Sequence, residues 1–399
     1  MPVDAFAPVL AISTRCDISA SGAGEDLLIG SGSNLDVLSC DSNNGHRYVF
    51  RARYEIFAER RSNVHGIIQS QHYGDSMIVY GEKSIALVRI GELRVPKRRV
   101  VTCDDWIQTV ALLDDGSLAV LFACNTIAVY HLVECVAEDS VTLQEYKRIR
   151  SSHKAVLFYS LLDGQTWPRL RAIVGTVFGD ILVWHPSEGS NVSQRFTGHM
   201  GMIFGLLLRD NHLFSISDDR SLRMWSMKSF TQLDEAYGHF ARPFAICDAT
   251  EGAIITAGQD GDVCIWNTNG DLLSLVHRIR IGRGAIRAML FHRNKIVLGT
   301  DGGLKCAIRM TPNLSPPYLV SRLTHKRPIR SFVHLSPTSY FVLDSNGILS
   351  ILRDGEAKKV MECESARCDS LLLCPSERFV TLSSPRVLFV VSGQLLRTF

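Results

Sequence analysis

The 399-residue sequence lacks the short motifs on which many catalytic and metal sites depend. It has no Cys-x-x-Cys pair of the kind that binds zinc, no Gly-Lys-Ser/Thr phosphate loop and no His-Glu-x-x-His metalloprotease helix. Gly30-Ser31-Gly32 is the one match to a glycine-rich loop for S-adenosylmethionine. It lies between two apolar runs with no helix after it, so a turn between strands is predicted. We therefore expect no enzymatic activity, no metal and no cofactor.

Long hydrophobic runs are absent too. The most apolar window, residues 117–133, is interrupted by Asn125 and Thr126, which predicts two strands and a turn rather than a membrane-spanning helix. The first six residues carry no basic group and include Asp4, so no secretory signal is predicted. The eleven cysteines are expected to be buried thiols rather than disulfides. A cytoplasmic protein without a membrane partner or a small-molecule substrate is expected.

The net charge of +3 conceals an uneven distribution. Residues 277–330 contain twelve Lys and Arg side chains against Asp301 alone, which leaves the rest of the chain net acidic. Such a segment can attract a polyanion through phosphate contacts and counterion release. The alternative is that arginines at alternating strand positions solvate an outer face, and the sequence leaves both interpretations open.

Three tryptophans, Trp184, Trp225 and Trp266, follow one another at intervals of 41 residues, and each ends a short alternating run. Gly198-His199 and Gly238-His239 precede the second and third. This period and this pairing are typical of WD repeats, in which each repeat forms one four-stranded blade of a β-propeller. An all-β WD-repeat propeller is predicted.

Two repeats also contain polar residues at matched positions, with Asp six residues before Trp in each. Buried together, a carboxylate, an imidazole, a hydroxyl and an indole N–H satisfy one another's hydrogen bonds. A His-Asp-Ser catalytic triad has the same residue types, but recurrence in consecutive repeats favours a structural role. The predicted structural tetrads are His199, Ser215, Asp219 and Trp225, and His239, Thr256, Asp260 and Trp266.

Weaker units in the same register bring the number of repeats to nine. Seven of them precede the proline-rich residues 312–317, which suit a link rather than a central strand. We predict a seven-bladed propeller over residues 1–325, with residues 318–323 as its last outer strand. Residues 326–399 are predicted to form two additional blades, the start of an incomplete second propeller. The weaker units end at Leu38, Val88, Tyr130, Ala307, Ile351 and Val390.

Three passages carry a more specific resemblance: residues 175–184, residues 198–205 and residues 282–288. Together they resemble the WD-repeat auxiliary subunit of the tRNA wobble-nucleotide ribose 2′-O-methyltransferase, and the resemblance extends from Asp105 to about Arg309. It implies a non-catalytic subunit that binds tRNA and directs an FtsJ-type methyltransferase to the anticodon loop. Members of that family are usually longer and resemble a chain of several propellers.

Two functions from different classes therefore remain. One is a tRNA-binding subunit, and the other is a general protein-interaction scaffold without nucleic acid. Arginine suits phosphate because its planar fork donates two parallel hydrogen bonds. For Arg287 an ion pair with Asp301 in the same blade is the alternative. The candidate RNA-binding residues are Arg278, Arg280, Arg283, Arg287, Lys326, Arg327 and Arg330.

Overall fold

The computed structural model describes residues 9–309 and the strands between residues 329 and 391. Not described within these limits are residues 17–24, 42–46, 58–62, 70, 74–75, 90–98, 250–251, 282–283, 293–294, 302, 337–338, 345–347, 354–355, 363–369, 375–378 and 384–387. Almost all regular structure in the described part is β-strand. Among the short turns of 3-10 helix between the strands are η2 (Gln71–Tyr73) and η4 (Trp167–Arg169). The all-β prediction is confirmed.

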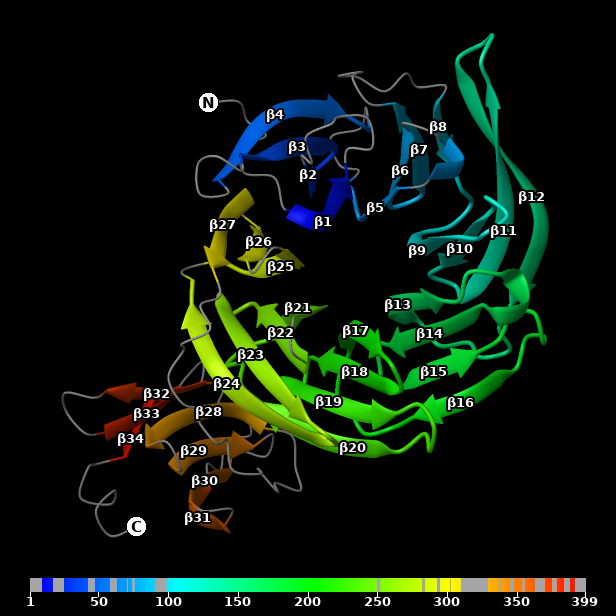
Figure 1. Ribbon diagram of the computed structural model, residues 1–399. Helices are drawn as coiled ribbons and strands as arrows, with labels where there is room; N and C mark the ends of the chain where they lie inside the picture. The colour runs from blue at the N-terminus through cyan, green and yellow to red at the C-terminus, as the bar shows by residue number, and fades with distance from the viewer. Residues whose placement is uncertain are drawn as a thin grey trace.

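Seven antiparallel sheets of consecutive strands follow one another around a ring (Figure 1). The first blade contains β1 (Val9–Cys16), β2 (Glu25–Ser31), β3 (Asn34–Asp41) and β4 (Arg47–Glu55). The second contains β5 (Gly66–Gln69), β6 (Ser76–Gly81), β7 (Ser84–Arg89) and β8 (Val100–Thr102). The third contains β9 (Ile107–Leu112), β10 (Leu118–Phe122), β11 (Thr126–Cys135) and β12 (Ser140–Arg150).

The other four blades repeat this arrangement. The fourth contains β13 (Leu157–Asp163), β14 (Arg171–Thr176), β15 (Ile181–Trp184) and β16 (Val192–Phe196). The fifth contains β17 (Ile203–Arg209), β18 (His212–Ser217), β19 (Ser221–Ser226) and β20 (Gln232–Tyr237). The sixth contains β21 (Pro243–Asp248), β22 (Ala253–Gly258), β23 (Asp262–Asn269) and β24 (Leu272–Arg280). The seventh contains β25 (Ile286–His292), β26 (Lys295–Thr300) and β27 (Gly303–Arg309), and its predicted outer strand, residues 318–323, lies outside the described residues.

The first strand of each blade lies innermost, and these inner strands contact one another all the way round the ring (Figure 1). β1 contacts β5 on one side and β25 on the other, so the first and seventh blades meet. Leu27 and Ile29 of β2 pack there against Ala288 of β25 and Val297 of β26. An apolar contact between the first and seventh blades therefore closes the ring.

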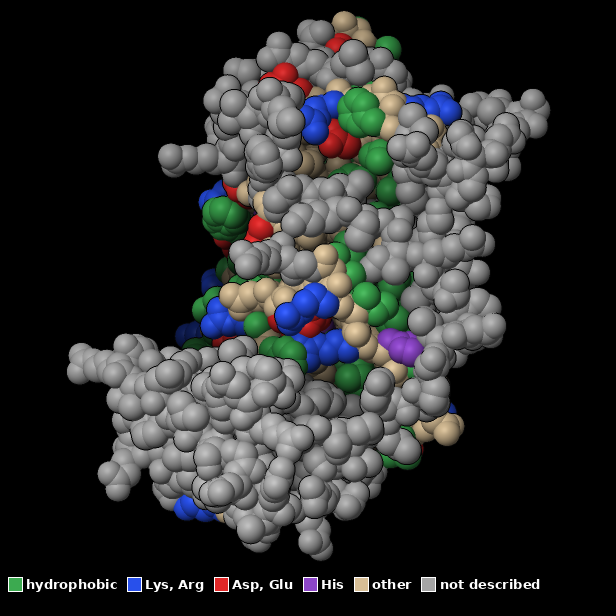
Figure 2. Space-filling model, turned by 90° about the vertical axis from the view of Figure 1, so that its left-hand side faces the viewer, with side chains coloured by type: hydrophobic (Ala, Val, Ile, Leu, Met, Phe, Trp, Pro, Cys, Tyr) green, Lys and Arg blue, Asp and Glu red, His purple; other side chains and the backbone are tan. Residues whose placement is uncertain are grey.

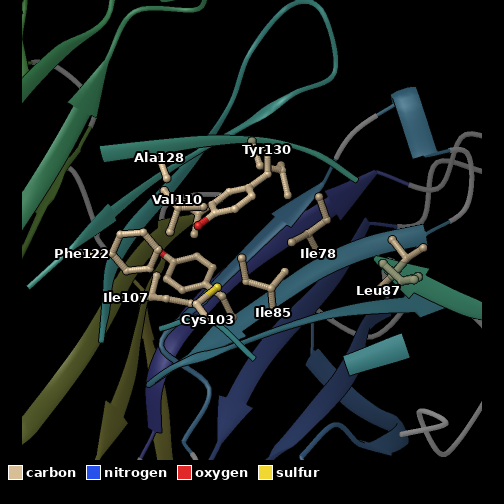
Figure 3. Close-up of a cluster of buried hydrophobic side chains, with 13 residues drawn as sticks. Ile78, Ile85, Leu87, Cys103, Ile107, Val110, Phe122, Ala128 and Tyr130 are labelled. Carbon is tan, nitrogen blue, oxygen red and sulfur yellow. The ribbon is translucent and has the colours of Figure 1, made fainter. Parts of the chain in front are cut away.

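Each blade is buried on both of its faces, which explains why the middle strands read as continuous apolar runs. In β14, Ile173 packs towards the fifth blade with Ile203, whereas Val174 packs towards the third blade with Leu121. Successive side chains of a strand point to opposite faces, so one apolar pair serves two interfaces. Figure 3 shows such an interface between the second and third blades, where Ile78 and Ile85 lie in one apolar cluster with Phe122 and Tyr130.

The turns between the second and third strands place one residue in the left-handed backbone region in six blades. Arg220 takes φ +69° between β18 and β19, Asn125 takes φ +57° and Glu82 takes φ +51°. Glycines occupy the matching place in the other three, for example Gly32 at φ +56° after Gly30 and Ser31 of β2. The Gly30-Ser31-Gly32 sequence therefore belongs to a blade hairpin, as the sequence predicted.

Two further sheets follow the ring along the chain (Figure 1). One contains β28 (Ile329–Ser336), β29 (Ser339–Asp344), β30 (Ile348–Arg353) and β31 (Glu356–Glu362). The other contains β32 (Ser370–Cys374), β33 (Phe379–Ser383) and β34 (Leu388–Val391). Seven blades and two additional sheets match the predicted architecture. The division at residues 325 and 326 stays a prediction, because it falls within the undescribed residues 310–328.

Candidate functional site

The first predicted tetrad forms one chain of hydrogen bonds across the fifth blade. Asp219, in the turn after β18, accepts from His199 Nδ1 at 2.9 Å. His199 Nε2 lies 2.7 Å from Ser215 Oγ on β18, and Ser215 Oγ accepts from the indole Nε1 of Trp225 at 2.8 Å. The hydroxyl therefore donates to the imidazole while it accepts from the indole. The structure brings together the four residues that the repeat spacing singled out.

The second tetrad repeats this arrangement one blade further on. His239 Nδ1 lies 3.1 Å from an Asp260 carboxylate oxygen, and its Nε2 lies 2.8 Å from Thr256 Oγ1. Trp266 Nε1 donates to the same hydroxyl at 2.8 Å. The same hydrogen bonds in two consecutive blades indicate a structural role, in which the tetrad holds the turns of the blade in place.

Burial decides what these groups can do chemically. Ser215 and Thr256 are fully buried, and His199 and His239 are nearly so. Burial by itself would raise the pKa of Asp219, but the imidazole of His199 and the hydrogen bonds to the carboxylate outweigh it and lower that pKa well below its usual range. The carboxylate is therefore ionised and fully engaged, and the hydroxyl beside the imidazole cannot meet a substrate.

The fourth blade has the tryptophan without the tetrad. Val174 lies ten residues before Trp184, where Ser215 and Thr256 lie ten residues before their own tryptophans. Within the described part of the chain the buried Nε1 of Trp184 has no hydrogen-bond partner. A valine at this position removes the acceptor and leaves the indole N–H unsatisfied.

Among the candidate RNA-binding residues, Arg278 on β24 lies inside the second tetrad's environment. Its Nε donates to Asp262 at 2.7 Å, its Nη2 lies 3.8 Å from Asp260, and its guanidinium lies 3.3 Å from the ring centre of Phe240. Only 16% of the side chain is exposed. Arg278 therefore braces the turn and offers little surface to a ligand.

Arg280 and Arg287 are more accessible, and each is held by one carboxylate. Arg280 Nε donates to the other oxygen of Asp262 at 3.0 Å, yet 69% of its side chain is exposed. Arg287 on β25 donates to Asp301 at 2.8 Å, which is the ion pair that the sequence offered as its alternative. Asp262 lies 15 residues before the basic segment 277–330, so the count of charges in that segment did not include the carboxylate that pairs with Arg278 and Arg280. Figure 2, seen from the side of β24 and β27, shows Lys and Arg side chains beside Asp and Glu.

The remaining candidates are not brought into this group. Arg283, Lys326 and Arg327 lie outside the described residues, and Arg330 lies on β28 without a described side chain. Among the described residues, no cluster of three or more His, Cys, Asp or Glu side chains could hold a metal ion. No helix in that part of the chain has the length and apolar character needed to cross a bilayer.

The closed ring of seven sheets, six of them four-stranded in the described residues, and the two buried tetrads define a WD-repeat β-propeller. The WD40 propeller domain of Doa1 superimposes with a TM-score of 0.57 at 17% identity, covering 75% of this chain and 91% of that domain. This likeness concerns the fold alone.

Sequence comparison then gives the particular relatives. The chain is 27% identical over 340 residues to the mouse "tRNA (34-2'-O)-methyltransferase regulator WDR6", covering 77% of this chain and 28% of the relative. It is 26% identical over 312 residues to the human protein of the same name, covering 71% of this chain and 26% of the relative. No family model matches. The predicted resemblance is confirmed, and the chain spans about a quarter of the length of these curated relatives.

Proposed function

We propose that the chain is a non-catalytic subunit that binds tRNA and helps an FtsJ-type methyltransferase to 2′-O-methylate the wobble nucleotide of the anticodon loop. The observation that carries this proposal is the similarity to proteins named as regulators of the tRNA (34-2'-O)-methyltransferase, which extends over more than 70% of the chain. We further propose that this role is carried out in the cytoplasm.

The chemistry of the described residues supports a binding role. The His, Asp and hydroxyl groups that resemble a triad are buried and bonded to one another, so they stabilise blades and do not reach a substrate. A propeller presents a rigid surface built from many turns, and such a surface suits recognition of a large ligand.

In this proposal, phosphates contact the exposed arginines of the sixth and seventh blades. Arg280 is largely exposed, and Arg287 is partly exposed on an inner strand. A phosphate can replace or share the carboxylate of an exposed ion pair, because such pairs contribute only about 0–1 kcal/mol each. Arg278 is excluded from this role, since two carboxylates and an aromatic ring enclose it. Arg283, Lys326, Arg327 and Arg330 remain proposed contacts on sequence grounds.

Filter binding of tRNA across a salt series tests the contact. Arg280→Gln combined with Arg287→Gln should weaken binding at low salt and reduce the salt slope by up to about 0.9 per lost phosphate contact. The matched control combines Arg195→Gln with Arg171→Gln, which are also partly exposed arginines, each paired with one aspartate on the fourth blade. The control should bind like the unmodified chain.

The scaffold function is the second candidate, and the neutralised arginines of the described surface favour it. If the unmodified chain fails to bind tRNA at low salt, or both double variants bind identically at every salt concentration, the RNA contact is removed. The scaffold function then takes its place.

A further inference from the structure

Three phenylalanines occupy the same position on three consecutive inner strands. Phe158 of β13, Phe204 of β17 and Phe244 of β21 each fall at a break in the register with the second strand of their blade. A β-bulge at this point turns the extra side chain out of the ladder. Phe158 and Phe204 meet edge to face at 5.0 Å, and so do Phe204 and Phe244. The rings form a continuous row across blades four to six.

Arg287 ends the row. It falls at the same register break in β25, and its guanidinium lies 4.1 Å from the ring centre of Phe244. Its carboxylate partner, Asp301, compensates its charge. The row therefore passes from aromatic rings to a neutral ion pair.

Exposed apolar side chains extend the row towards the turns of blades four and five. Val156, two residues before Phe158, is 58% exposed, and its carbonyl accepts from the backbone N–H of Val177. Next to Val177, Phe178 is 76% exposed. Gly179 follows, so close to the loop at His199–Gly201 that a Cβ would lie 2.4 Å from the His199 carbonyl oxygen. That loop carries Met200, which is 65% exposed. We call this surface the aromatic face, and its members are Val156, Phe158, Phe178, Met200, Phe204 and Phe244.

Hydrogen bonds hold the two most exposed members in place. The buried Thr176 hydroxyl accepts from the backbone N–H of Phe178 at 3.3 Å and from that of Asp180 at 3.0 Å. The backbone N–H of Met200 donates to the tetrad carboxylate of Asp219 at 2.9 Å. Large apolar side chains on fixed turns gain more from association than side chains on loops that must first be ordered.

The charge around the aromatic face selects the kind of partner. Three bordering arginines are each paired with an aspartate: Arg195 with Asp180, Arg242 with Asp218, and Arg287 with Asp301. Lys154, exposed beside Val156, adds one positive charge, which is little for a polyanion. An apolar centre inside a polar border of balanced charge is the arrangement found at protein interfaces.

We propose that the aromatic face docks a partner protein through an uncharged segment that inserts apolar side chains between Phe178, Met200 and the phenylalanine row. Val156, Phe158, Phe178 and Met200 are exposed, whereas Phe204 and Phe244 are partly buried. Large apolar side chains exposed near one another mark an interaction site. Its energy comes from burying apolar area, so binding is insensitive to salt. This proposal does not depend on tRNA binding.

A phage-displayed library of random dodecapeptides, selected on the intact chain, supplies the probe. The test variant combines Phe178→Ser with Met200→Ser. The matched control combines Val136→Ser, in the turn after β11, with Leu272→Ser, at the start of β24; both are exposed apolar residues elsewhere on the ring. Selected peptides should carry apolar side chains and no net charge. Their Kd should rise at least tenfold in the test variant, stay unchanged in the control, and hold steady from 50 to 500 mM salt. All three proteins should melt at the same temperature, because no core side chain is altered.

Three outcomes overturn the proposal. The first is that no peptide is enriched, and the second is that enriched peptides bind the test variant as tightly as the unmodified chain. The third is that a twelve-nucleotide oligouridylate binds the chain and loses affinity in the test variant but not in the control, since the aromatic face would then be a platform for nucleic acid bases.

Discussion

Replacing Asp219 by alanine tests the tetrad more severely than any other single change. The carboxylate accepts from His199 Nδ1, from the backbone N–H of Met200, and from both the backbone N–H and the hydroxyl of Ser221. The Asp219 side chain is 2% exposed, so in an alanine variant water cannot reach these donors and take the place of the carboxylate unless the turn rearranges.

The magnitude follows from these four donors. A buried donor without an acceptor costs about 1–3 kcal/mol, and relaxation of the turn prevents the four costs from adding in full. We expect Asp219→Ala to lower the free energy of unfolding by about 3–5 kcal/mol, because more than one of these buried donors loses its acceptor. The matched control is Asp180→Ala, from the corresponding turn of the fourth blade, where Arg195 is the partner and is half exposed. That change should cost about 0–1 kcal/mol.

Urea denaturation monitored by tryptophan fluorescence measures both variants, at pH 7 and at pH 3. The pKa of Asp219 is lowered in the folded chain, so its stabilisation is present above the unfolded value of about 3.9 and is lost as the pH falls. The difference between the Asp219 variant and the unmodified chain should therefore shrink at pH 3. Equal costs for the two variants at pH 7, or a difference that grows on acidification, would refute the reasoning.

Two further substitutions follow from the same contacts. Val174→Thr should lower the free energy of unfolding, measured by urea denaturation, by at least about 1 kcal/mol less than Val120→Thr does. Both valines are buried, but only at residue 174 can the new hydroxyl accept a hydrogen bond from the unsatisfied indole of Trp184, so equal losses of stability would contradict this explanation. Arg278→Gln should lower the free energy of unfolding by about 1–3 kcal/mol in a thermal melt and leave the affinity for tRNA unchanged, because Asp262 holds this guanidinium out of reach of phosphate. A loss of tRNA affinity at unchanged stability would contradict the structural role of Arg278.

The sequence predicted the parts of the fold that depend on local spacing. Trp225 on β19 and Trp266 on β23 lie at matching positions in consecutive blades, and each tetrad is assembled from residues within about 27 positions of one another. The tight turns and the indole acceptors follow from that spacing. Closure of the ring between the first and seventh blades depends on packing between residues that are far apart in sequence. The only sequence signal for it was the spacing of the weaker repeats, which brought the number of blades in the ring to seven.

The binding surface was harder to predict, because it depends on residues that are distant in sequence. The basic segment begins at residue 277, whereas the carboxylate that holds Arg278 and Arg280 belongs to Asp262 on the preceding strand. The pairing of the two strands in a hairpin brings these residues together, and a count of charges along consecutive residues does not reveal this contact. The aromatic face was missed for a related reason. Phe158, Phe204 and Phe244 are far apart in sequence and become neighbours only when the inner strands are aligned at their bulges. Aligning the repeats on those strands would have found them.

The central claim is that this chain assists methylation of tRNA and performs none itself. The most direct measurement is a reconstituted reaction with tRNA, S-adenosylmethionine and an FtsJ-type methyltransferase, in which mass spectrometry reports the 2′-O-methyl content of nucleotide 34 with and without the chain. The proposed function predicts that the chain increases methylation by the enzyme and yields no product in its absence. Methylation that is unaffected by the chain, or product formed by the chain alone, would contradict it.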